Sequence, residues 1–88
     1  MVLRIFTVYD SKAEAYLQPF FMRNKGEALR AFADMANDPK HQFCKHGEDF
    51  SLFEIGEYDE DTGQISTYEA KKALGVAVEF FQGSGGAL

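Results

Sequence analysis

The sequence predicts an α+β protein, with one main α-helix packed on one face of an antiparallel β-sheet of four to five strands. The expected order of elements is β-β-α-β-β-(short α)-β. Two observations support this prediction: residues 2–9 are apolar on both alternating faces of an extended segment, and residues 24–36 have the clearest helical periodicity in the chain. Its 88 residues suffice for one small core. We therefore expect a single domain over 1–81 and a flexible Gly/Ser tail over 82–88.

The first two strands are predicted at 2–9 and 15–22. The segment VLRIFTVY at 2–9 is apolar on both faces, which is typical of an interior strand in a sheet that is covered on both sides. A polar turn at 10–14 leads to the second strand, which we expect to be antiparallel to the first. Pro19 cannot donate to a hydrogen-bond ladder, so it places the second strand at a sheet edge or gives it a bulge.

The main helix is predicted to begin after Asn24, which suits an N-cap, with Glu27 three residues later completing a variant capping box. The sequence NDP at 37–39 ends this helix, because the residue before a proline resists the helical conformation. The apolar stripe of the helix is expected to consist of Leu29, Phe32, Ala33 and Ala36, flanked by Ala28 and Met35.

The second half of the chain begins with a polar connection at 40–49. Segments 50–58 and 64–68 flank the loop DEDTG, whose Gly63 suits a left-handed turn position, so a β-hairpin is expected. Residues 69–75 are predicted as a short helix closed by Gly75, and residues 76–81 as a final strand. Because one helix covers only one face of such a sheet, we expect the other face to meet a second copy of the chain in a homodimer.

The net charge of −5 resides entirely in residues 51–88, since the first fifty residues carry seven basic and seven acidic side chains. A protein that coats duplex DNA needs a surplus of Lys and Arg, so nucleic-acid binding must be local to the first half. The single cysteine, Cys44, excludes an internal disulfide and fits a reducing compartment. No apolar run approaches the ~18 residues of a membrane span, so we expect a cytoplasmic protein with no membrane contact.

No catalytic or metal site assembles from the sequence. The cluster His41, Cys44 and His46 lacks the fourth ligand and the paired spacing of a structural zinc site. An EF-hand register in DEDTGQ places Gln64 where the loop requires glycine. We therefore expect no enzyme activity, no cofactor and no metal.

The stretch FFMRNKGEALRAF at 20–32 is the candidate binding region, because basic residues surround a helix start whose free N–H groups attract anions. Two aromatic residues are expected to share a strand face just before it, where they could stack a base. The alternative is that these rings are core and the basic side chains are merely solvated. Phe21, Leu29 and Phe32 are assigned to the core by their spacing. The candidate nucleic-acid-binding residues are Arg23, Asn24, Lys25, Arg30, Tyr16 and Phe20.

The segments DSKA, PFF, NDP and LGVAVEF, together with the pattern F.KH..D..LFE.G..D...G, closely resemble the small nonstructural protein of gokushoviruses. These are single-stranded DNA bacteriophages of the Microviridae, subfamily Gokushovirinae, and the similarity covers roughly residues 1–81. The resemblance implies an early accessory protein of viral DNA replication or of single-stranded DNA packaging in the host bacterial cytoplasm, assigned in some cases to DNA binding. The implied partners are single-stranded DNA or viral replication and packaging proteins. The alternative is a dimeric adaptor that contacts only proteins.

Overall fold

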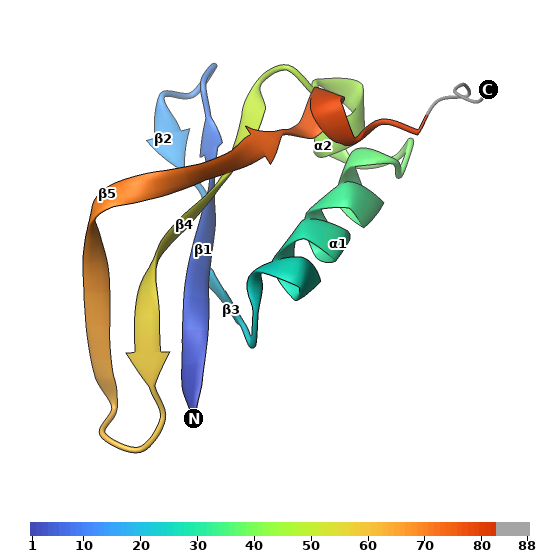
Figure 1. Cartoon of the computed structure of the whole chain (residues 1–88). Coiled ribbons are helices and arrows are strands. Elements are labelled where there is room, and N and C mark those ends of the chain that lie inside the picture. Colours follow the sequence, from blue (N-terminus) through green and yellow to red (C-terminus); the bar gives the residue numbers. More distant parts are fainter. Residues whose placement is uncertain (83–88) are drawn as a thin grey trace.

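A computed structural model describes residues 1–82 (Figure 1), so the expected tail lies almost wholly outside the described residues. The helices are α1 (Lys25–Ala36), α2 (Gln42–Lys45) and a 3-10 helix, η1 (Ala77–Phe80). The strands are β1 (Val2–Asp10), β2 (Ala15–Tyr16), β3 (Phe20–Met22), β4 (Phe50–Asp59) and β5 (Gln64–Val76). One antiparallel sheet with one main helix confirms the predicted α+β class.

The strands follow the order β2-β1-β4-β5, and β3 also pairs with β1. The interior position predicted for β1 is confirmed, as is the edge position predicted from Pro19, because β2 and β3 lie on either side of that residue and pair only with β1. Tyr16 pairs with Tyr9, but Phe20 pairs with Phe6, so the register shifts by one residue between the two short strands. A shift of one residue reverses the face. The prediction that Tyr16 and Phe20 share a strand face is therefore wrong.

Helix α1 begins as the sequence predicts. Asn24 has extended backbone angles, and its side-chain oxygen accepts a hydrogen bond of 2.9 Å from the backbone N–H of Glu27. The residues that α1 buries fully are Ala28, Phe32 and Ala36, one turn apart on the same stripe.

The core lies between α1 and the face of the sheet that this helix covers. Phe32 is fully buried and packs at 5.3–5.4 Å, between ring centroids, against Phe43 of α2 and Phe80 of η1. The sequence assigned residues 40–49 to a polar connection, yet α2 lies within this segment and delivers Phe43 to the core. The buried core residues are Phe6, Val8, Ala28, Phe32, Ala36, Phe43, Phe50, Leu52 and Ala77.

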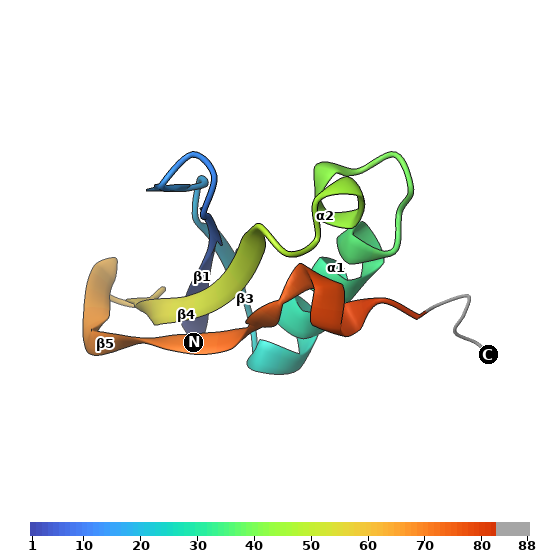
Figure 2. The same ribbon diagram turned by 90° about the horizontal axis from the view of Figure 1, so that it is seen from above.

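The hairpin formed by β4 and β5 is confirmed, with Gly63 at a φ of 75° in its loop. The short helix predicted at 69–75 is wrong, because β5 continues to Val76 and its pairing with β4 provides the backbone partners that a helix would have supplied internally. The final strand predicted at 76–81 is also wrong: η1 occupies this segment and buries Ala77 completely. Viewed from above, the three helices gather on one side of the sheet (Figure 2).

Candidate functional site

The side of the sheet that faces away from α1 is here called the open face. Its residues alternate along β1 with those that enter the core, and the strand registers extend the set to the neighbouring strands. No helix of the described chain covers this side (Figure 2). The open face contains Leu3, Ile5, Thr7, Tyr9, Tyr16, Phe21, Phe53, Tyr58, Ile65 and Lys71.

One end of the open face is an aromatic cluster made of Tyr9, Tyr16, Phe53 and Lys71. The rings of Tyr9 and Tyr16 are 4.8 Å apart, and Phe53 meets Tyr16 edge-on at 6.1 Å. Lys71 Nζ lies 5.4 Å from the ring centroid of Tyr16, in cation–π range. Tyr16 remains 47% exposed. The cluster thus places a half-exposed aromatic ring next to an exposed positive charge.

A sharp bend in β5 brings Lys71 to the aromatic cluster. Between the pairs Gly56–Thr67 and Glu54–Lys72, β4 has a single residue where β5 has four, and this excess accompanies the corner that Figure 1 shows in β5. Lys71 therefore reaches Tyr16 even though β1 and β4 separate their two strands. The sheet curls around the open face.

The other end of the open face is an apolar patch made of Leu3, Phe21, Tyr58 and Ile65, which lie over the buried Ile5. Phe21 meets Tyr58 edge-on at 5.7 Å. Phe21 is 44% exposed and Ile65 is 55% exposed. The assignment of Phe21 to the core was therefore wrong, because the register of β3 turns its ring to the open face.

A buried carboxylate lies at the bend of β5. Glu54 is 1% exposed. Its carboxylate accepts a 2.5 Å hydrogen bond from the hydroxyl of Tyr68, and the Arg4 guanidinium lies 3.4 Å from it. Burial, together with the hydrogen bond to Glu54, raises the pKa of Tyr68 to about 12. Sequence reasoning missed this group, although an acid within the apolar run SLFEI was the available signal.

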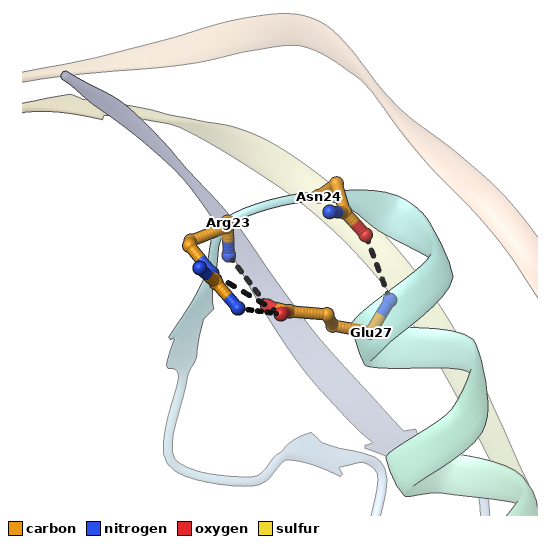
Figure 3. A network of polar contacts seen from close by, with 3 residues as sticks. All are labelled: Arg23, Asn24 and Glu27. Carbon is orange, nitrogen blue, oxygen red and sulfur yellow. Dashed lines mark hydrogen bonds and ion pairs between the residues drawn. The ribbon is translucent and has the colours of Figure 1, made fainter.

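At the start of α1, where the sequence predicts a phosphate contact, the side chains of Arg23, Asn24 and Glu27 already form hydrogen bonds within the protein (Figure 3). Arg23 donates to the Glu27 carboxylate at 2.7 Å, and the backbone N–H of Arg23 donates to it at 3.1 Å. This hydrogen bonding lowers the pKa of Glu27. Lys25 and Arg30 are exposed. A phosphate at this helix start would compete with Glu27 for Arg23.

The predicted binding residues therefore do not form one site. Phe20 stacks on Phe6 at 5.7 Å on the core side of the sheet, whereas Tyr16 belongs to the open face. Arg23, Asn24, Lys25 and Arg30 lie together at the start and first turns of α1. Of the six, Tyr16 alone lies in the aromatic cluster, and no sequence pattern indicates that Lys71 joins it.

The residues of the metal-like cluster have structural roles. His41 Nδ1 accepts a 3.0 Å hydrogen bond from the backbone N–H of Phe43 and caps α2. Cys44 is half-buried on that helix, and His46 is its exposed C-terminal cap residue. Within residues 1–82, no three His, Cys, Asp or Glu side chains are grouped to hold a metal ion. Nor does any helix in that range have the length and apolarity to cross a membrane.

Comparison with known proteins identifies the family. The model of the family described as Phage ORF5 protein matches residues 3–80, nearly the entire described chain. The chain belongs to the Phage ORF5 protein family. The chain is also similar to Protein ORF5 of Chlamydia phage 1, with 35% identity over 69 residues that cover 74% of this chain and 72% of the relative. This confirms the resemblance to a small gokushovirus protein. No solved structure matches.

Proposed function

We propose that this member of the Phage ORF5 protein family is a non-enzymatic accessory factor of viral single-stranded DNA replication or packaging, acting in the host bacterial cytoplasm. In this proposal it binds single-stranded DNA weakly and directly, through the aromatic cluster of the open face. Its membership of a phage family supports the setting. The DNA contact is supported by the geometry of the cluster.

The observation that carries the proposal is the position of Lys71 over the half-exposed ring of Tyr16. Proteins that bind single strands without sequence preference stack bases on aromatic rings and place cations beside them for the backbone. Each stacked base contributes about 1–3 kcal/mol. Tyr16 offers a ring, Tyr9 and Phe53 hold that ring in place, and Lys71 offers the charge. Duplex DNA is not expected to bind this way, because its bases are already stacked.

The affinity should be weak because the site is small and the chain is acidic. One or two stacked bases and a phosphate contact through Lys71 give a dissociation constant in the micromolar range or weaker. For single strands the logarithmic salt slope is about −0.7 per phosphate neutralised, so the one cation of the cluster, Lys71, should give a shallow slope of about −0.7.

The test is fluorescence anisotropy with a labelled single-stranded oligonucleotide, measured over a salt series for the parent and for three variants. Tyr16→Ala and Lys71→Ala should weaken binding, the first by roughly 5- to 150-fold. The matched control is Lys72→Ala, which removes the same charge from the adjacent residue, whose ammonium lies 4.5 Å over Tyr68 instead. Equal losses in Lys71→Ala and Lys72→Ala would contradict the proposal, as would a parent that does not bind at low salt.

A second candidate is a protein adaptor that has no contact with nucleic acid. The observation that favours it is the apolar patch, which contains no charged residue, beside a hairpin loop that carries Asp59, Glu60 and Asp61. In this alternative the acidic loop binds a basic protein. The anisotropy experiment separates the two candidates, because the adaptor predicts no salt-dependent DNA binding.

A further inference from the structure

We propose that the apolar patch docks against the same patch of a second copy of this chain, with a two-fold axis running along β1. This inference concerns a different end of the open face from the aromatic cluster and does not depend on DNA binding. The patch consists of Leu3, Phe21, Tyr58 and Ile65, as defined above.

The composition of the patch favours a protein surface over DNA or an anionic membrane. Its four side chains carry no charge, and no cation is available among them for a phosphate. The nearest hairpin loop, at 59–63, adds three carboxylates against one nearby cation, the Met1 ammonium that pairs with Asp61 at 3.4 Å, so its net negative charge repels both phosphate backbones and anionic lipid headgroups. A patch of exposed aromatic and aliphatic side chains with a polar border is typical of a protein interaction site.

The charges on the two sides of the patch favour a second copy as the occupant. Val2 pairs with Asp59 on one side of β1, and Arg4 pairs with Met22 on the other. The acidic hairpin loop and the start of α1, which carries the exposed Lys25, therefore lie on opposite sides of β1, as Figure 1 shows for these elements.

A two-fold axis along β1 places the two patches face to face. It also puts the side of one copy that carries the acidic loop opposite the side of the other copy that carries the start of α1. The acidic loop of each copy then meets Lys25 at the helix start of the other, twice in the dimer, while Arg23 keeps its ion pair with Glu27. A two-fold axis perpendicular to the strands would instead place the acidic loop of one copy opposite the acidic loop of the other, and one helix start opposite the other helix start, so that like charges meet. Charge complementarity therefore selects the axis along β1.

The exposed area predicts a weak dimer. Phe21 and Ile65, exposed by 44% and 55%, together offer roughly 200 Å² if a large side chain presents about 150–250 Å². With the half-buried Leu3 and Tyr58, two copies would bury roughly 500–600 Å² of apolar surface, about half of the ~1,200 Å² at which stable specific interfaces begin. The charged flanks must supply the rest, so we expect association at tens to hundreds of micromolar.

The experiment is analytical ultracentrifugation of the full chain from about 10 µM to about 1 mM. The apparent mass of the parent should rise with concentration from the 9.9 kDa of a monomer toward twice that value. Ile65→Glu should remain a monomer throughout. Val78→Glu places the same charge on η1 at a residue of similar exposure, 42%, and should associate like the parent. Circular dichroism confirms that each variant is folded.

Charge exchange tests the orientation of the dimer. Lys25→Glu and Glu60→Lys should each weaken association roughly 2- to 30-fold, since the axis repeats every exposed contact. The double variant should recover the affinity of the parent. A parent that stays monomeric at all concentrations would overturn the proposal, as would equal losses in Ile65→Glu and Val78→Glu. A double variant no better than its single variants would overturn the proposed axis.

Discussion

Replacing Tyr68 by phenylalanine should destabilise the protein by removing a single hydroxyl group. That hydroxyl donates the 2.5 Å hydrogen bond to Glu54, whose side chain is 1% exposed. After the change, the carboxylate keeps only the 3.4 Å contact to Arg4, whose own side chain is 43% exposed. A hydrogen bond to a charged group contributes about 1.5–3 kcal/mol, and a buried acceptor left without its partner costs a similar amount. We expect Tyr68→Phe to cost about 1.5–3 kcal/mol.

The assay is urea unfolding followed by circular dichroism. For a chain of this size the urea dependence is about 1 kcal/mol per molar, so the midpoint should fall by about 1.5–3 M. Tyr58→Phe is the matched control, because in the described structure the hydroxyl of Tyr58 makes no hydrogen bond to another residue. In a Glu54→Gln background the same change at Tyr68 should cost only about 0.5–1.5 kcal/mol, since the acceptor is then neutral. A midpoint for Tyr68→Phe equal to that of Tyr58→Phe would show that the hydrogen bond from Tyr68 to Glu54 does not stabilise the fold.

The remaining predictions concern pH, packing and capping. Folding raises the pKa of Tyr68 from 10.0 to about 12, so the stability that this residue contributes should be complete below pH 10 and lost as the pH rises through 12. The measurement is the difference between the urea midpoints of the parent and Tyr68→Phe across this pH range. Phe32→Ala should cost about 3–5 kcal/mol, because this ring is fully buried between two others; a smaller loss in urea unfolding would contradict the described core. Asn24→Ala should cost about 1 kcal/mol through the lost cap and leave the anisotropy of bound DNA unchanged.

The parts of the fold that the sequence predicts correctly are those in which local chemistry decides the structure. Asn24 begins α1 because its side chain fits the cap, and Gly63 closes the hairpin because its positive φ suits glycine. The two-sided apolar pattern of 2–9 correctly predicts an interior strand. In each case the signal lies within a few residues of the feature.

The errors occur where distant contacts override local preference. EAKKALG at 69–75 has good helix formers, but pairing with β4 holds it in a strand. The one-residue shift around Pro19 separates Tyr16 from Phe20, and no local pattern fixes such a shift. The contact between Lys71 and Tyr16 depends on the curl of the whole sheet. The sequence therefore predicted Tyr16 as a binding residue but not Lys71.

The most direct test of DNA binding through the aromatic cluster is an NMR titration of the isotope-labelled chain with a short single-stranded oligonucleotide at low salt. If DNA binds through the open face, chemical shifts should change progressively at Tyr9, Tyr16, Phe53 and Lys71, around the exposed ring and its cation. Shifts confined to Arg23–Arg30 would place the DNA at the start of α1 instead. Such a result, or a spectrum that DNA leaves unchanged, would contradict binding through the open face.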